Sequence, residues 1–179
     1  MPSGSDKQIR LATSRVTLRR LTDADAENLF ELDSDPEVIR YVHQPAPATV
    51  ADVRSGSLAR FRACEKTCPR LGFWAAIDNL TGEFMGWFHL RPWQGRVDEL
   101  ELGYRLKRSC WGRGLATEVS SALLTKAFDE LGATRVMALT LAANRASIRV
   151  MEKLGMSRVA SFTESGEPAV VYAVSKPTA

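Results

Sequence analysis

The stretch ELELGYRLKRSCWGRGLATE, residues 99–118, decides the fold class of this chain. Its first part, ELELGYRL over 99–106, alternates polar and apolar side chains, which predicts a strand with Gly103 as a candidate bulge. Farther on, between Ala116 and Leu131, apolar residues recur at every fourth position, which predicts a helix. The stretch is therefore a strand that leads through a turn into a helix.

The turn itself, WGRG over 111–114, has the composition of an anion-binding loop. Gly112 and Gly114 let a ligand approach the backbone closely, and Arg113 adds a positive charge. The first N–H groups of a helix have no partner within it, and the helix dipole favours anions there. A phosphate or pyrophosphate is the expected ligand, although a plain tight turn into a helix would use the same glycines. The stretch is neither a Walker A loop nor a three-glycine dinucleotide fingerprint.

Around this stretch the sequence predicts one mixed α/β domain over residues 13–176, preceded by a flexible tail over 1–12. The expected order, leaving out a short helix at 36–41, is β-α-α-β-β-β-α-β-α-β-β. Strands are expected at 16–20, 72–78, 83–90, 99–106, 135–141, 156–162 and 168–175. Helices are expected at 22–32, 36–41, 50–64, 116–131 and 144–154. The stretch PWQGRVD at 92–98 is expected to be a loop.

The composition of the 179 residues excludes several classes of protein. A hydrophobic fraction of 45% and a charged fraction of 25% are ordinary for a globular domain and exclude intrinsic disorder. No apolar run reaches the length of a membrane helix, and the start MPSGSDKQIRL lacks the apolar stretch of a signal peptide. We therefore expect a cytoplasmic protein without a membrane partner, either a monomer or a homodimer.

Charge and cysteine content narrow the partners further. The net charge is only +3, without a block of like charges, so we expect no nucleic-acid partner. Three cysteines, Cys64, Cys68 and Cys110, argue against a disulfide framework, and with two distant histidines they predict no metal site.

Two blocks carry a family resemblance. WGRGLA at 111–116 matches the acyl-CoA motif Gln/Arg-x-x-Gly-x-Gly/Ala at Gly114 and Ala116, with Trp111 where Gln or Arg is usual. NRASIRVMEKLGM at 144–156 resembles a second block of the same family. The chain resembles the GNAT superfamily of N-acetyltransferases, and most of all the branch of the ribosomal-protein alanine acetyltransferases. The likeness covers nearly all of 14–175.

The resemblance implies a mixed, mostly antiparallel seven-stranded sheet with helices on both faces. The strands at 99–106 and 135–141 would splay apart, and acetyl-CoA, the co-substrate, would lie in the gap. Its amide-rich pantetheine arm could pair with the backbone groups that the splay leaves free. The expected cofactor-binding residues are Tyr104, Leu106, Trp111, Gly112, Arg113, Gly114, Leu115, Ala116, Thr117 and Asn144.

Acetyl transfer to an amine requires a proton acceptor and a donor for the oxyanion. Glu101 is the expected base, either directly or through water, and Glu99 lies on the same face of the strand. Both carboxylates could instead line a solvated face. A backbone N–H of Tyr104 or Leu106 would serve the oxyanion. Direct transfer needs no covalent intermediate, so Cys110 is not expected to be a nucleophile.

Ser147 is the expected proton donor to the departing thiolate. Many family members have a tyrosine where this chain has Met151, and a serine at the position of Ser147 is thought to replace it in the resembling branch. Ser147 could instead only support the start of the helix that Asn144 caps. Asn144 could act as a cap alone or also bind the pantetheine arm.

The remaining aromatic residues are expected to be structural. Trp74, Trp87 and Phe88 would form core or pocket wall, and Trp93 would stand in a loop beside the acceptor cleft. The acceptor pocket would come from residues 36–60 and 91–98.

The sequence thus predicts an acetyl-CoA-dependent N-acetyltransferase, with the α-amine of a peptide, protein N-terminus or amino acid as the first choice of acceptor. An enzyme of the same fold acting on a polyamine or antibiotic is the alternative, since Asp98, Glu99 and Glu101 could make an acidic cleft. A non-catalytic CoA-binding module is the alternative from another class.

Overall fold

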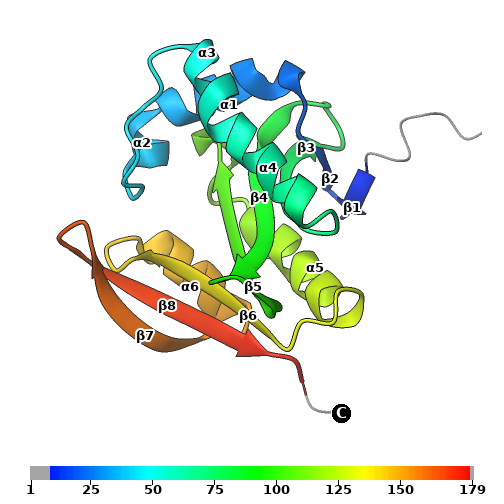
Figure 1. Cartoon of the computed structure of the whole chain (residues 1–179), viewed down its shortest axis with the longest axis vertical. Helices are drawn as coiled ribbons and strands as arrows, with labels where there is room; N and C mark the ends of the chain where they lie inside the picture. Colours follow the sequence, from blue (N-terminus) through cyan, green and yellow to red (C-terminus); the bar gives the residue numbers. More distant parts are fainter. Residues whose placement is uncertain (1–8, 178–179) are drawn as a thin grey trace, which may run out of the picture.

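The computed structural model describes residues 9–177, which form one eight-stranded sheet with helices on both faces (Figure 1). The strands are β1 (Ile9–Ala12), β2 (Val16–Arg20), β3 (Gly72–Asp78), β4 (Phe84–Trp93), β5 (Arg96–Leu106), β6 (Arg135–Leu141), β7 (Ser157–Glu164) and β8 (Glu167–Ser175). The helices are α1 (Ala26–Ser34), α2 (Pro36–Ile39), α3 (Val50–Val53), α4 (Ala59–Thr67), α5 (Leu115–Asp129) and α6 (Arg145–Lys153). None of the described helices is long and apolar enough to cross a membrane.

The sheet consists of two antiparallel parts joined by one parallel contact. Its strand order is β1-β2-β3-β4-β5-β6-β8-β7, and only β5 and β6 run parallel. In Figure 1, β6, β8 and β7 cross the direction of β4 and β5. The connection from β5 to β6 passes through α5, which is the long crossover that a parallel pair requires.

Two hydrophobic clusters hold helices to opposite faces of the sheet. The segment from α1 to α4 packs its apolar residues, among them Leu29, Leu58 and Phe61, against Phe73 and Trp87 of the sheet. The residues of α5 and α6 pack against the other face, in a cluster that contains Val119, Leu123, Ile148, Trp74 and Phe88. Trp74 and Phe88 are therefore core residues, as the sequence predicts.

Local capping explains where several helices begin. The Asp25 carboxylate accepts a hydrogen bond from the Thr22 N–H at 2.8 Å, and Asp35 accepts one from the Glu37 N–H at 3.0 Å. The expected helix at 50–64 forms, but Arg54–Leu58 in its middle is a π-helical segment between α3 and α4.

Two expectations from the sequence are corrected. The tail expected at 1–12 ends earlier, because Ile9–Ala12 pair with β2; this strand raises the expected seven strands to eight. Residues 1–8 lie outside the described residues. The loop expected at 92–98 is a hairpin turn, because Gln94 and Gly95 take φ of 50° and 82° and let β4 continue directly into β5.

Gly103 in β5 supplies the space for a side chain of the neighbouring strand. A Cβ at Gly103 would lie 2.5 Å from Cε1 of His89, its cross-strand partner. His89 is buried and stacks against Trp87, with ring centroids 5.8 Å apart. The glycine is therefore a packing requirement of the sheet and not a bulge.

We expect Gly103→Ala to destabilise the fold by about 1–3 kcal/mol, because the added methyl group overpacks the His89 ring. Denaturant unfolding measures the change. Gly56→Ala is the matched control, since a Cβ there meets nothing within 4 Å and the glycine lies in a helical segment. The control should be neutral or stabilising by up to about 1 kcal/mol. Equal effects of both substitutions would contradict the packing role of Gly103.

Candidate active site

The site begins where β5 and β6 separate. The two strands pair only from Glu99 to Glu101, opposite Arg135 to Met137, although β5 continues to Leu106 and β6 to Leu141. The predicted splay is therefore present. The backbone edges that face each other beyond Glu101 are left for a ligand to pair with.

The orientation of β5 directs amide groups into this gap. The N–H of Lys107 donates to the Met85 carbonyl of β4 at 2.8 Å. Because successive amides of a strand point to opposite sides, the N–H groups of Leu106 and Tyr104 point away from β4, toward the gap. These are the two amides expected from the sequence to serve the oxyanion.

A cavity of about 470 Å³ opens along the gap. Its lining combines the fork of the sheet with α6, the turn before α5, and the segment at and after α2. Among its residues are Glu37, Tyr41, His43, Trp87, His89, Arg91, Glu101, Tyr104, Leu106, Trp111, Gly112, Ala116, Asn144, Ser147, Met151 and Glu164. Of the regions expected to build the acceptor pocket, 36–60 contributes residues at and after α2, and 91–98 contributes Arg91 alone.

The loop before α5 has the backbone of an anion cradle. Gly112 and Gly114 take left-handed φ values of 72° and 75°. The first helical bond of α5 runs from the Glu118 N–H to the Gly114 carbonyl, so the N–H groups of Leu115, Ala116 and Thr117 have no partner within the helix. Their amides can therefore receive an anion, whereas the Leu115 side chain is buried in the core.

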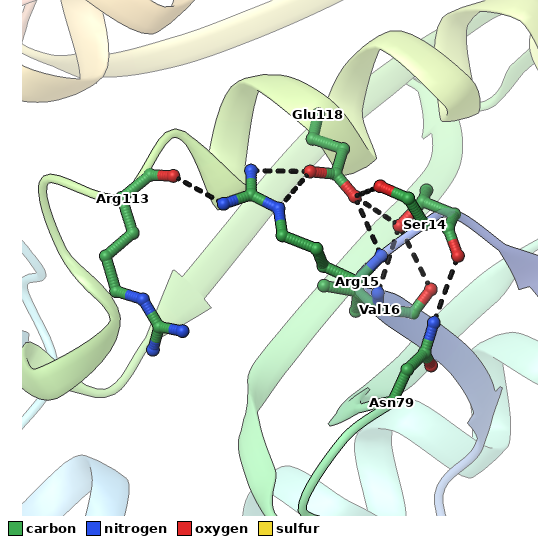
Figure 2. Close-up of polar contacts among 7 residues, drawn as sticks. Ser14, Arg15, Val16, Asn79, Arg113 and Glu118 are labelled. Atoms are coloured by element: carbon green, nitrogen blue, oxygen red, sulfur yellow. Dashed lines mark hydrogen bonds and ion pairs between the residues drawn. The ribbon is translucent and has the colours of Figure 1, made fainter.

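Trp111 ties this loop to the sheet. Its indole Nε1 donates to the carbonyl of Leu106, the last residue of β5, at 2.9 Å. The residue as a whole remains 46% exposed. The Arg113 side chain is also exposed, and Figure 2 shows its guanidinium directed away from Glu118. Trp111 thus fixes the distance between the cradle and the open edge of β5.

Glu101 lies at the fork and is bound by an arginine. Its carboxylate forms a two-point contact with Arg91 of β4, Nε to Oε2 at 2.9 Å and Nη2 to Oε1 at 2.8 Å. Burial alone would raise the pKa of Glu101, but the neighbouring His89 and Arg91 outweigh it and lower the pKa to about 2. The group is therefore a carboxylate at neutral pH and a very weak base.

His89 lies beside this pair in a buried position. Burial lowers the pKa of its imidazole, and the nearby Glu101 carboxylate only partly opposes that shift. Its Nε2 is 3.4 Å from Oε1 of Glu101, but without the alignment of a hydrogen bond. The main restraint on Glu101 is therefore Arg91.

Ser147 and Tyr104 bring two hydroxyl groups together on the α6 side of the fork. The Tyr104 Oη and Ser147 Oγ atoms are 3.4 Å apart. Burial raises the pKa of Tyr104, so its hydroxyl keeps the proton at neutral pH. Met151, in the place of the tyrosine usual in the family, is buried in the wall of the cavity.

Asn144 is a helix cap. Its side-chain oxygen accepts from the Ser147 N–H at 3.2 Å, and its amide nitrogen donates to Thr140 Oγ1 at 3.1 Å. The capping of α6 thus uses the backbone of Ser147 and leaves the hydroxyl of that residue facing Tyr104.

The other residues singled out from the sequence lie away from this site. Glu99 is 3.6 Å from Arg96 and is not part of the cavity wall. Trp93 was expected beside the acceptor cleft, but the continuous β4–β5 hairpin places it at the end of β4, where it packs with Met137 and Val171. Cys110 is buried in the main core.

Sequence reasoning missed Arg91, His89 and the hydroxyl of Tyr104. The signal for the first two is the alternation of β4, where positions 87, 89 and 91 pair with 105, 103 and 101 of β5 and share one face. The Arg105 guanidinium completes this row, 5.2 Å from the Trp87 ring and bound to Asp33 of α1 at 2.5 Å.

The comparison with known families decides the identity of the fold. The family model described as an acetyltransferase (GNAT) domain matches residues 15–157. This chain belongs to the GNAT acetyltransferase family. It is an N-acetyltransferase that uses acetyl-CoA as co-substrate, as the resemblance implied. Its assignment to the alanine acetyltransferase branch remains a prediction.

Relatives and solved structures of this GNAT enzyme agree with the family. It is 33% identical over 162 residues to an FsC-acetyl coenzyme A-N(2)-transacetylase of Aspergillus fumigatus, covering 87% of this chain and 68% of the relative. Its fold is similar to a GNAT acetyltransferase from Bacillus anthracis, with a TM-score of 0.80, 23% identity and coverage of 92% and 97%. It is also similar to aminoglycoside acetyltransferase AAC(6')-Ib in complex with coenzyme A, with a TM-score of 0.73, 25% identity and coverage of 90% and 95%.

We expect Gly114→Val to abolish the rise in melting temperature that coenzyme A produces in the wild type, because valine cannot keep the left-handed backbone of the cradle. Gly132→Val is the matched control. Gly132 follows α5 at its far end with φ of 73°, so valine causes similar backbone strain there without touching the cradle. Calorimetric titration with coenzyme A measures both. Wild-type affinity in Gly114→Val would contradict the cradle.

The low pKa of Glu101 predicts how stability depends on pH. A carboxylate whose pKa is lowered by folding stabilises the native state above its unfolded pKa and loses that contribution as the pH falls toward about 2. Glu101→Gln should therefore be less stable at pH 7 by roughly 2–4 kcal/mol, and the difference should shrink steadily below pH about 4.5. Denaturant unfolding across the pH range measures it.

Glu99→Gln is the control for this substitution, because Glu99 has only a longer contact with a half-exposed arginine. Its effect should stay below about 1 kcal/mol. A Glu101→Gln variant whose deficit did not change between pH 7 and pH 3 would show that the Arg91 contact does not govern the charge of Glu101.

Proposed function

We propose that the enzyme transfers the acetyl group of acetyl-CoA directly to a primary amine of low pKa, carried by a small polar molecule. One observation carries this proposal: the carboxylate at the fork, Glu101, is held by Arg91 and has a pKa of about 2. A group of that acidity cannot take a proton from an ordinary alkylammonium ion at neutral pH.

Acetyl-CoA fits the open edge and the cradle. The N–H groups of β5 beyond Glu101 offer pairing partners to the amides of the pantetheine arm. The pyrophosphate would lie on the free amides at the start of α5, with Arg113 and the backbone of Gly112 beside it. Asn144 and Trp111 would then border the arm at the two ends of the gap.

The residues at the fork supply electrostatic stabilisation for the addition step. As the amine attacks the thioester, its nitrogen becomes positively charged and the carbonyl oxygen negatively charged. The Glu101 carboxylate stabilises the first charge electrostatically, and once the C–N bond has formed the nitrogen loses its proton through ordered water to the bulk solvent. A backbone N–H of Tyr104 or Leu106 stabilises the second. As the C–S bond breaks, Ser147 passes a proton to the departing thiolate and regains one from Tyr104, which is reprotonated from solvent.

This arrangement favours amines that are already partly neutral. An α-amine, with a pKa of about 7.7–8.0, is roughly a tenth neutral at pH 7, whereas a lysine amine of pKa about 10.4 is neutral at well under one per cent. An amine next to electron-withdrawing oxygens, as in an amino sugar, also has a lowered pKa. Polyamines and lysine side chains lack that advantage.

The cavity favours a small acceptor over a protein chain. It holds about 470 Å³, and residues at and after α2 form part of its wall. The carboxylates of Glu37 and Glu164 on its wall suit a cationic guest. AAC(6')-Ib, which shares the fold, has been solved with paromomycin and acetyl-CoA. An amino sugar is therefore the first candidate, and the α-amine of an amino acid or peptide is the second.

A thiol-release assay with four acceptors tests this order: paromomycin, a peptide starting with Ser, spermidine, and an N-blocked peptide containing Lys. At pH 7 we expect the first two to exceed the last two by about 300-fold in kcat/KM, the ratio of the neutral amine fractions. This difference in kcat/KM should become smaller toward pH 9. Equal or faster turnover of spermidine or the lysine peptide would overturn the low-pKa rule. If coenzyme A binds but no amine causes release of free thiol from acetyl-CoA, the result would favour a non-catalytic module.

A further inference from the structure

The turn between β1 and β2 is bound to the first turn of α5, about a hundred residues later in the chain (Figure 2). Glu118 of α5 accepts hydrogen bonds at Oε1 from the Thr13 hydroxyl at 2.6 Å and from the Arg15 N–H at 3.2 Å. The Ser14 hydroxyl adds a longer contact at 3.3 Å. The helix that follows the anion cradle is thus fastened at its start to the N-terminal hairpin.

The Arg15 side chain extends this contact to the cradle itself. Its Nε and Nη2 atoms lie 2.6 Å and 2.5 Å from Oε2 of Glu118. Its Nη1 donates to the Arg113 carbonyl at 2.9 Å. One planar guanidinium therefore joins the helix start to the peptide between the two left-handed glycines, Gly112 and Gly114.

The hairpin turn is itself held in place from the sheet. The Asn79 N–H donates to the Arg15 carbonyl at 2.9 Å, and the Asn79 side chain donates to the Thr13 carbonyl at 3.0 Å. Figure 2 shows Asn79 approaching the turn from the side opposite Glu118. The arginine is thus attached to a backbone that is fixed at both ends.

The chemistry of this contact concerns the anion that the cradle receives. A carboxylate at position 118 lies within the first turn of the helix, where it would repel a bound phosphate unless a cation compensates it. Arg15 supplies that cation. By accepting from Nη1 of Arg15, the Arg113 carbonyl also stays turned toward the hairpin, so the loop presents amide hydrogens to the ligand.

We propose that Arg15 and Glu118 form a clamp that positions the 112–114 loop for the pyrophosphate of coenzyme A. The inference rests on the proposed function, in which that loop receives the pyrophosphate. Neither residue touches the reacting atoms, so both are positioning residues. The clamp acts on the anionic part of the cofactor alone.

The test compares acetyl-CoA with S-acetylpantetheine, which carries the same thioester without the pyrophosphate. Arg15→Ala should raise KM for acetyl-CoA about 10-fold or more and leave kcat within two-fold. The kcat/KM for S-acetylpantetheine should change by less than two-fold. A merely structural role would lower kcat/KM for both acetyl donors together. Equal losses of kcat/KM with the two donors, or no loss with acetyl-CoA, would overturn the proposal.

Two further variants separate charge from geometry. Arg15→Lys keeps the charge but cannot reach Glu118 and the Arg113 carbonyl at once, so it should give an intermediate KM for acetyl-CoA and keep the proposal testable if Arg15→Ala unfolds. In the double variant Arg15→Ala with Glu118→Gln, the KM should rise less than in Arg15→Ala alone, because the uncompensated carboxylate is gone. A double variant as impaired as Arg15→Ala would contradict the electrostatic part.

Arg54→Ala is the control, since Arg54 is about as exposed as Arg15 and pairs with Glu27 at 2.8 Å, away from the cradle. This variant should leave KM and kcat unchanged for acetyl-CoA and for S-acetylpantetheine. Titration with coenzyme A distinguishes failure of the clamp from failure of the proposed function. If no amine releases thiol but Arg15→Ala still weakens coenzyme A binding about 10-fold, the clamp stands and the acetyl transfer fails.

Discussion

The limited pairing of β5 with β6 is the constraint on which the rest of the site depends. Three residues on each strand meet, and the strands then diverge. Each strand beyond that point is satisfied on its outer side, β5 by β4 and β6 by β8, and open on its inner side. Backbone groups in such a place need partners, because leaving them buried and unpaired costs free energy. The helix starts of α5 and α6 and the segment after α2 gather around these open groups.

The electrostatics of the fork follow from the alternation of two strands. On the face toward the first helices, β4 presents Trp87, His89 and Arg91, and β5 answers with Arg105, Gly103 and Glu101. Each cross-strand pair therefore has its own chemistry: a cation over an aromatic ring, a ring over a glycine, and an ion pair. The ion pair lies at the last position before the strands part. Within this pair, the Glu101 carboxylate stays negatively charged throughout the neutral pH range.

The features that the sequence predicts correctly are those with local causes. The glycines of 111–114 and the caps at Thr22 and Asp35 depend on a few neighbouring residues, and all are present in the structure. The splay followed only from the family resemblance, because no local pattern states where two strands part. Glu101 could be singled out, but its acidity could not be foreseen.

The reason is that the partners of these residues are remote. Arg91 reaches Glu101 only because Gln94 and Gly95 make a tight turn, and Gln94 is not a residue from which a left-handed backbone is expected. The same misjudged turn put Trp93 in a loop. The Arg15–Glu118 contact joins positions separated by 103 residues, which only the complete fold brings together.

The His89 ring occupies the space that a side chain at position 103 would need, and this limits which substitutions the two positions tolerate. One strand gives up its side chain so that the other can place an imidazole there, and the two positions therefore share a single space. A larger residue at 103 is acceptable only after 89 has become smaller, whereas a smaller residue at 89 first opens a void. Substitutions at these two positions are thus ordered, and a larger side chain at 103 requires an earlier change at 89.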